Sequence, residues 1–341
     1  MLVTGVFDIL SMIRSYTRPS RFWNACKVYA SYQLSRLFGK PIQWGFPISL
    51  SIEPTTACNL RCPQCPSGLR QFSRATGRIQ EDDFTHIVNE VKKHAGYLTF
   101  YFQGEPYIHA RFTEMVKYAA RQGMYTATST NAHFLDEGNA RKTVACGLSR
   151  LIISIDGSTQ ETYGKYRLEG SLEKVLEGTR NLVEARKEAG SRHPYIIWQF
   201  IVFAHNEHQL PEMHKLAKEY GVDKLAVKTA QIYDYEDAED WLPKDKSLSR
   251  YSRGENGVQM QTEWPNRCWR LWNSCVITWD GNVVPCCFDK DAKHNLGNVA
   301  DVKFKDIWNG EAYRNFRKSL IAGRKNIDIC RNCSEGTKVW V

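Results

Sequence analysis

Three closely spaced cysteines, Cys58, Cys62 and Cys65, have the residue type and spacing to bind metal together. They follow an alternating apolar run at residues 48–53, which predicts a β-strand, and Pro54 ends that run. Thiolates on one tight loop can converge on a single metal centre. Three of them leave one iron of a four-iron cluster open, because each iron takes its own thiolate. The alternatives are a zinc site or unrelated buried thiols, although zinc ligands usually come as paired Cys-x2-Cys halves.

The pattern Cys-x3-Cys-x2-Cys on the loop after a first strand resembles the radical S-adenosylmethionine (radical SAM) family. The resemblance implies that Cys58, Cys62 and Cys65 hold a [4Fe–4S] cluster whose open iron binds SAM. It further implies that one electron cleaves SAM to methionine and a 5′-deoxyadenosyl radical, which takes a hydrogen from the substrate. Gln64 departs from the family, in which an aromatic residue often precedes the third cysteine.

From residue 48 onward, predicted strands alternate with predicted helices, which indicates a parallel sheet with right-handed crossovers. Over residues 48–230 this resembles the partial (β/α)6 barrel of the radical SAM family, so we predict an α/β fold. The chemistry is then expected at the C-terminal ends of the strands. The predicted strands are 48–53, 98–103, 124–130, 150–155, 195–203 and 224–230, and the predicted helices are 81–95, 111–122, 137–146, 171–188 and 207–220.

Polar segments follow several of these strands. Gly104 and Glu105, in a Gln-Gly-Glu-Pro segment, resemble the family segment that hydrogen-bonds the SAM amino group. Glycine allows close backbone approach there, and a carboxylate accepts from an ammonium. Asp156 lies in an Asp-Gly pair that is either part of the site or only a helix-entry turn. The resemblance implies further SAM contacts for Ser129, Asn131, Ser154 and Arg167. No motif marks a catalytic acid or base.

A second group of cysteines lies between residues 268 and 333. Asp280-Gly281 separates two alternating runs and predicts a β-hairpin that brings its flanking thiols together. A helix is predicted near residues 311–322. This arrangement resembles the SPASM/twitch domain that follows many radical SAM barrels and holds auxiliary iron–sulfur clusters. We therefore assign residues 263–341 to such a domain.

The number of thiols in this region permits one fully ligated auxiliary [4Fe–4S] cluster, which needs four. Cys286 and Cys287 are neighbours on a strand and point to opposite faces, so one of the two is expected to bind. A zinc ribbon is the rival interpretation. The predicted ligands are Cys268, Cys286, Cys330 and Cys333, with Cys275 or Cys287 as replacements.

The composition is that of a globular protein: 42% of the 341 residues are hydrophobic, and no apolar run approaches the ~18–20 residues that span a bilayer. The net charge of +9 indicates a basic surface. Nine of the eleven cysteines group at metal-ligand spacings, and no signal-peptide pattern precedes them. We therefore expect a reducing, cytoplasmic location.

Two further segments flank the barrel. Residues 1–47 form a basic, amphipathic helical extension, with Val6, Leu10 and Ile13 on one apolar face. This extension either packs on the barrel or, through residues 1–40, contacts an anionic membrane at its inner face. Residues 231–262 are polar and acidic, as in a linker or a substrate-facing loop.

Together these features predict a radical SAM oxidoreductase that passes an electron to its auxiliary cluster, in a dehydrogenation or bond formation. A flavodoxin or ferredoxin would supply electrons. The first alternative is a maturase of a ribosomal peptide or protein, which is disfavoured because we identify no leader-peptide-binding domain before the barrel. The alternative from another class is a zinc-stabilised module that binds nucleic acid. No nucleic acid is expected as a partner, because the sequence matches no RNA-binding signature. The substrate is not marked by any motif.

Overall fold

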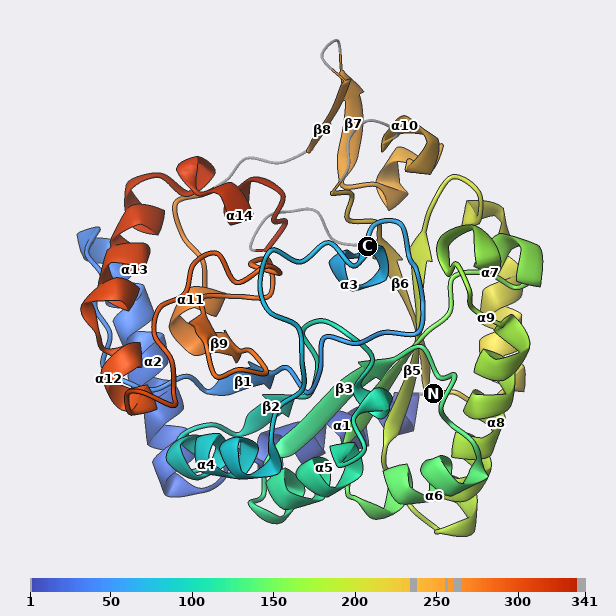
Figure 1. The fold of residues 1–341 in the computed structure, drawn as a ribbon, viewed down its shortest axis with the longest axis horizontal. Helices are drawn as coiled ribbons and strands as arrows, with labels where there is room; N and C mark the ends of the chain where they lie inside the picture. The colour runs from blue at the N-terminus through green and yellow to red at the C-terminus, as the bar shows by residue number, and fades with distance from the viewer. Residues whose placement is uncertain (1, 234–237, 255–256, 261–264, 336–341) are drawn as a thin grey trace.

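A mostly parallel sheet organises the computed structural model, which describes residues 2–233, 238–254, 257–260 and 265–335. Its first six strands follow one another in sequence order and curve around a lumen, with helices on the outside (Figure 1). The predicted partial barrel is therefore confirmed. The strands are β1 (Ser49–Ile52), β2 (Tyr97–Thr99), β3 (Tyr125–Thr130), β4 (Arg150–Ser154), β5 (Tyr195–Val202) and β6 (Lys224–Thr229).

The covering helices lie close to the predicted ranges. The prediction missed α3 and α7; α7 begins at a Thr159 side chain that accepts from the Thr162 N–H, a local capping signal. Helix α9 starts later than predicted, because a 3-10 turn (Glu207–Gln209) precedes it. These helices are α3 (Pro66–Leu69), α4 (Glu81–Val91), α5 (Phe112–Arg121), α6 (Glu137–Ala145), α7 (Gln160–Tyr166), α8 (Leu172–Glu188) and α9 (Leu210–Glu219).

The strands divide their side chains between core and lumen. In β1, Leu50 and Ile52 are buried in the same apolar core as the helices, whereas Ser49 and Ser51 face the lumen. The second strand is shorter than predicted, because residues 100–103 leave the sheet. The chain there bends toward the loop after β1 and reaches a residue with positive φ, Gly104.

The C-terminal region continues the sheet of the barrel. Strand β9 (Ser274–Ile277) pairs in parallel with β1, and β10 (Val283–Val284) pairs with β9 in antiparallel fashion. The predicted hairpin around Asp280-Gly281 is thus confirmed, with Gly281 at a φ of +84°. The remaining helices of this region are α11 (Arg270–Asn273), α12 (Phe304–Trp308), α13 (Glu311–Gly323) and α14 (Asp328–Arg331).

Residues 231–262, predicted as a linker or loop, contain short elements that project from the barrel (Figure 1). These are α10 (Ala238–Trp241), a 3-10 turn (Lys246–Leu248) and the hairpin of β7 (Tyr251–Gly254) and β8 (Gly257–Met260). The most acidic part of this segment, 234–237, lies outside the described residues.

Two helices precede the barrel, as predicted: α1 (Leu2–Arg14) and α2 (Pro19–Phe38). Helix α2 begins at a proline, which suits the first turn of a helix. Helix α1 runs behind the sheet in Figure 1, where it contacts β5, and α2 extends along the side toward α13. None of the described helices is long and apolar enough to cross a membrane.

Candidate cluster and cofactor site

The three thiols of the first group lie on the loop between β1 and α3. The loop is tight: the Cys65 N–H donates to the Cys62 carbonyl at 3.2 Å. A Cβ atom at Gly68 of α3 would come within 2.5 Å of the Cys62 nitrogen, so only glycine fits. Burial raises the pKa of the Cys58 thiol to about 12 and also raises the pKa of Cys62. Such thiols ionise when they bind metal.

One cavity of about 180 Å³ at the C-terminal ends of the strands gathers every residue that the sequence assigned to this cluster and to SAM. A larger cavity of about 610 Å³ adjoins it at Cys58 and Ser67, behind the loop, but contains none of the predicted SAM contacts. The assigned residues that line the smaller cavity are Cys58, Cys62, Cys65, Gly104, Glu105, Ser129, Asn131, Ser154 and Arg167. The sequence therefore predicted a set of residues that the fold brings together.

Gly104 and Glu105 connect the loop after β2 to its neighbours. A Cβ atom at Gly104 would meet the Thr55 carbonyl at 2.2 Å, so glycine permits this approach. The buried Glu105 carboxylate accepts from the Thr130 hydroxyl at 2.7 Å and from the Asn131 N–H at 2.8 Å. Burial raises the pKa of Glu105 to about 7, which these hydrogen bonds oppose. Glu105 thus has partners within the chain, whereas the family resemblance implied that its segment meets the SAM amino group.

Arg167 carries a positive charge into the cavity. Its Nη1 lies 3.7 Å from the Cys62 sulfur, and its Nε donates to Asp156 at 2.6 Å. Asp156 is fully buried and also accepts from the Ile201 N–H at 2.7 Å. The sequence left Asp156 open between a site residue and a turn; the structure makes it the residue that holds Arg167.

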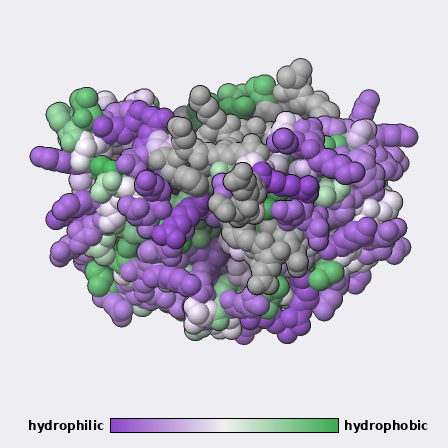
Figure 2. All heavy atoms as spheres, turned by 90° about the horizontal axis from the view of Figure 1, so that it is seen from above, coloured by the Kyte–Doolittle hydropathy of each residue, from purple (hydrophilic) through white to green (hydrophobic). Residues whose placement is uncertain are grey.

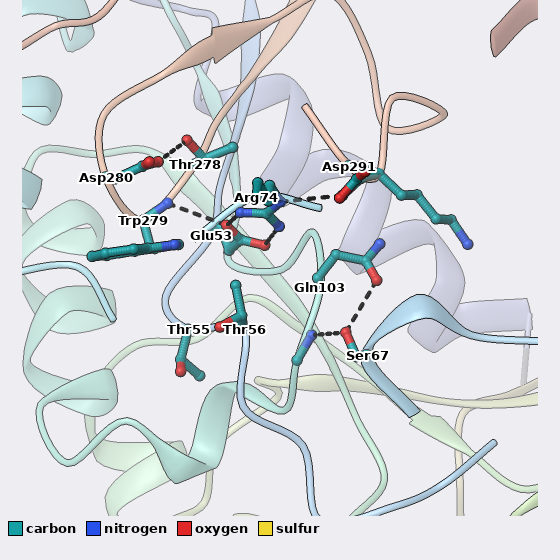
Figure 3. A network of polar contacts seen from close by, with 12 residues as sticks. Glu53, Thr55, Thr56, Ser67, Arg74, Gln103, Thr278, Trp279, Asp280 and Asp291 are labelled. Atoms are coloured by element: carbon teal, nitrogen blue, oxygen red, sulfur yellow. Dashed lines mark hydrogen bonds and ion pairs between the residues drawn. The ribbon is translucent and has the colours of Figure 1, made fainter. Parts of the chain in front are cut away.

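Gln64 and Gln103 both have partners in the structure; Gln103 stands where the family's GGEP-type motif has its first glycine. The Gln64 side-chain oxygen accepts from the Tyr233 N–H at 2.7 Å, which joins the cluster loop to the segment after β6. The Gln103 oxygen accepts from the Ser67 hydroxyl at 3.0 Å, and that hydroxyl accepts from the Gly104 N–H at 2.9 Å (Figure 3). Ser67 was not predicted as a site residue, because no sequence pattern indicates that α3 contacts the segment after β2.

A buried polar network ties the barrel to the C-terminal region (Figure 3). Arg74, which follows α3, donates to both oxygens of Glu53 at 2.6 and 2.9 Å. Glu53 is fully buried and also accepts from the Trp279 N–H at 3.2 Å. The Ser73 N–H donates to Asp291 at 2.8 Å. The segment after the cluster loop is thereby fixed to the hairpin between Cys268 and Cys286 and to the chain that follows it.

Four C-terminal thiols come together: Cys268, Cys286, Cys330 and Cys333. Burial raises the pKa of all four, and the charge of Cys268 adds to the rise at the other three. The Cys333 N–H donates to the Cys330 carbonyl at 3.2 Å. Arg324, which is fully buried, donates to the Cys333 sulfur at 3.3 Å. This set is the one predicted from the sequence.

The two replacement thiols have different surroundings. Cys275 is buried beside Tyr313 and Arg317, within the apolar core. Cys286 and Cys287 were predicted to be neighbours on a strand, but β10 ends at Val284 and both lie in the turn that follows it. Both line one cavity, and Cys287 also lies near Tyr101. Neither replacement is needed to complete the group of four.

The lumen of the barrel separates the two groups of thiols. It holds a cavity of about 440 Å³, lined by inward polar side chains such as Ser51 and Thr99 and by Cys286 and Cys287. Tyr101 lines both this cavity and the one that contains the first three thiols. The two cavities therefore adjoin, and a molecule in the lumen would lie between the two groups.

Lys290 is a further polar residue of the site that was not predicted from the sequence. It lines the cavity of the first three thiols, and its Nζ lies 4.1 Å from the centre of the Tyr233 ring. Burial lowers its pKa. Its place three residues after Cys287 gave no signal, because the hairpin and the cluster loop meet only in the fold.

Comparison with known proteins finds a family for the barrel and for the C-terminal region. The family model of the radical SAM superfamily matches residues 52–217, and that of the SPASM iron–sulfur cluster-binding domain matches residues 268–334. The chain therefore belongs to the radical SAM superfamily and carries a C-terminal SPASM domain. Its cofactors are a SAM-binding [4Fe–4S] cluster and auxiliary iron–sulfur clusters.

Individual relatives cover most of the chain. It is 29% identical over 320 residues to the tungsten-containing aldehyde ferredoxin oxidoreductase cofactor-modifying protein of Pyrococcus furiosus, covering 84% of this chain and 86% of that protein. It is 26% identical over 316 residues to the PqqA peptide cyclase of Gluconobacter oxydans, with 86% and 84% coverage. Streptococcus suis SuiB bound to S-adenosylmethionine has a similar fold, with a TM-score of 0.63, 13% identity, and 89% and 75% coverage.

The residues present fit these cofactors. The first three thiols open onto a polar cavity. The other four lie together, and three of them, Cys268, Cys330 and Cys333, are beside the buried Arg324. Among the described residues, no three or more His, Cys, Asp or Glu side chains are arranged to hold a single metal ion. The thiolates of a four-iron cluster bind separate irons and do not share one ion.

Proposed function

We propose that this protein is a radical SAM oxidoreductase that oxidises a substrate held between its two groups of thiols. The observation that carries the proposal is the meeting of the two cavities at Tyr101. One cavity contains the first three thiols, and the other reaches Cys286 of the second group. A substrate in the lumen would therefore lie next to both cofactors.

The first cluster is assigned to Cys58, Cys62 and Cys65, and the auxiliary cluster to Cys268, Cys286, Cys330 and Cys333. When bound, these groups supply the electron that cleaves SAM, the 5′-deoxyadenosyl radical that takes a substrate hydrogen, and an acceptor for the electron that the substrate then loses. Four thiols saturate the irons of the auxiliary cluster, which suits it to electron transfer and not to substrate binding.

The side chains of the protein hold and orient these components. Arg167 offers a fixed guanidinium for the SAM carboxylate, because Asp156 holds it at 2.6 Å. Glu105 fixes the end of β3 and so places Asn131, whose amide donates to Asn59 at 2.8 Å. The groups that we expect to meet the substrate are Tyr101, Cys287 and Lys290.

A peptide is the substrate class that the comparisons favour. One relative is named for the cyclisation of the PqqA peptide and another for the modification of a protein's cofactor. We therefore place the maturation of a peptide or of a peptide-derived cofactor ahead of the dehydrogenation of a small molecule. A flavodoxin or ferredoxin is the proposed electron donor, because such small acidic proteins suit a chain with a net charge of +9.

The radical chemistry is tested under anaerobic conditions. Protein reconstituted with iron and sulfide should bind about eight irons per chain and form 5′-deoxyadenosine from SAM and dithionite. Changing Cys58, Cys62 and Cys65 to alanine should remove about four irons and all 5′-deoxyadenosine. The matched control Cys26→Ala, at an exposed thiol outside both groups, should change neither value. Zinc in place of iron, or clusters that never cleave SAM, would overturn the proposal.

The substrate class is tested separately. A cell extract from the source organism should raise 5′-deoxyadenosine formation above the rate without substrate. Treating the extract beforehand with a protease, which is then removed, should abolish the increase if the substrate is a peptide. An increase that survives protease but is lost on removal of small molecules would assign a small substrate and leave the radical chemistry intact.

A further inference from the structure

Helix α2 presents polar side chains to the protein, which is the reverse of the usual pattern. Its buried residues follow one face at three- and four-residue spacing, and most of them are polar. Helices on protein surfaces normally bury their apolar face and expose the polar one. The buried residues of α2 are Arg21, Asn24, Val28, Ser31 and Ser35. The same reversal occurs in α1, which buries Asp8, and Ser15, the residue after its end, is buried too.

Hydrogen bonds fix these polar faces against the N-terminal end of the barrel. The fully buried Arg21 guanidinium donates to the Lys92 carbonyl at 2.8 and 3.0 Å and to the Gln122 carbonyl at 3.0 Å. Asp8 accepts from Tyr125, the first residue of β3. The orientation of both helices is therefore set by specific partners, and their outer faces are held in place.

The outer faces are apolar. Of the fourteen large hydrophobic residues that are exposed among the described residues, ten lie between residues 6 and 44, and each of the ten is at least 51% exposed. They are Val6, Ile9, Leu10, Ile13, Phe22, Trp23, Tyr29, Leu37, Phe38 and Trp44. Figure 2 shows, by contrast, a face of the molecule on which hydrophilic residues dominate. Such a concentration of exposed apolar side chains marks an interaction surface.

The charges around this surface have one sign. Five basic side chains are exposed in the same segment, and the lone acidic residue of residues 1–47, Asp8, is buried. The exposed basic residues are Arg14, Arg18, Lys27, Arg36 and Lys40. A second copy of the chain would place like charges opposite one another and is disfavoured. An anionic surface would pair with all of them.

We propose that α1 and α2 bind this protein to the surface of an anionic phospholipid bilayer. Aromatic and aliphatic side chains such as Trp23 and Phe22 would enter the interfacial region, while the basic residues contact lipid phosphates. This mixture of Trp, Phe and Leu with Lys and Arg is typical of helices that lie in a membrane interface. Binding at the surface needs no spanning helix.

The surface lies away from the cofactor cavity. Tyr125, which bonds to α1, begins β3, whereas Ser129 and Asn131 line the cavity at the other end of that strand (Figure 1). A bilayer bound at α1 would therefore leave the cavity facing the aqueous side. The protein could then be held at the membrane while it takes its substrate from solution.

Flotation of the full-length protein with vesicles tests this proposal. It should float with vesicles of phosphatidylcholine and phosphatidylglycerol, bind pure phosphatidylcholine much more weakly, and dissociate as salt rises. The double variant Phe22→Gln and Trp23→Gln should lower the partition coefficient at least tenfold. The matched control Leu168→Gln and Val302→Gln alters exposed apolar residues elsewhere and should leave binding unchanged.

Charge reversals test the choice of an anionic partner. Lys27→Glu with Arg36→Glu should lower binding roughly tenfold or more, whereas Lys174→Glu with Lys187→Glu, on the exposed face of α8, should not. All of these variants keep the thiols and should form 5′-deoxyadenosine at the unaltered rate in solution. No flotation with any vesicle, or flotation that ignores charge, would overturn the proposal. Self-association of the chain that the Phe22 and Trp23 changes abolish would assign the surface to a second copy and overturn it too.

Discussion

The two groups of thiols each have an arginine beside them, but the surroundings of the two arginines differ. Arg167 lies 3.7 Å from the Cys62 sulfur, and Asp156 balances its charge. Arg324 lies 3.3 Å from the Cys333 sulfur, and the thiols of Cys268, Cys330 and Cys333 raise its pKa. The first group opens onto a polar cavity, whereas the second already has four thiols. The first arrangement is suited to hold a ligand, and the second to stabilise an added electron.

The largest expected difference follows from removing one thiol from each group. Cys62→Ala should abolish 5′-deoxyadenosine formation, because the cluster that binds SAM loses one of its three protein ligands. Cys333→Ala should retain 5′-deoxyadenosine formation but lose the oxidised product, because the substrate electron has no acceptor. Iron counting and product analysis by mass spectrometry distinguish the two variants. Equal loss of 5′-deoxyadenosine in both would contradict the separate roles.

A smaller but still large effect is expected at the ion pair of the first group. Asp156→Asn leaves the Arg167 charge buried without its partner, which typically costs about 3–5 kcal/mol. The apparent melting temperature of the reconstituted protein should therefore fall by several degrees. The KM for SAM should rise, because Arg167 is no longer held in place.

An exposed ion pair provides the control for that change. Arg111 and Glu81 pair at 2.9 Å with both side chains about half exposed, so Glu81→Gln should leave the melting temperature and the KM unaltered. If Asp156→Asn behaved like this control, Asp156 would not be the residue that positions Arg167.

Much of the first group was predictable because its signals are local. The thiol spacing, the strand periodicity and the polar residues at the strand ends all lie within short segments, and parallel strands bring their C-terminal ends to one edge. Asp156 was ambiguous for a different reason. An Asp-Gly pair is equally compatible with a simple turn and with a carboxylate that holds a distant arginine. Only the fold shows that Asp156 contacts Arg167.

The second region was harder to predict because its key contacts join distant segments. No sequence pattern indicates that β9 pairs with β1, at Ser49 and Ser274, or that Arg324 reaches Cys333 from the end of α13. The reversed faces of α1 and α2 were missed for a similar reason. The apolar residues of these helices are visible in the sequence, but the sequence does not show which face packs on the barrel. That choice depends on hydrogen bonds to distant carbonyl groups such as that of Lys92.

The smallest expected effect is a shift in reduction potential at the second group. At an effective dielectric constant of ~20, a unit charge about 6 Å from a cluster contributes ~3 kcal/mol, on the order of 100 mV for one electron. Arg324→Gln should therefore lower the midpoint potential of the auxiliary cluster by up to this amount and leave the SAM-binding cluster unchanged. Arg324→Lys keeps the charge and should restore most of the potential, even though it loses the contact with the Arg267 carbonyl at 3.2 Å.

Redox titration followed by electron paramagnetic resonance measures both clusters in one sample. A potential that is the same in the wild type and Arg324→Gln would mean that the arginine only supports the fold around Cys333, and the contrast between the two arginines would then lie in packing and not in charge.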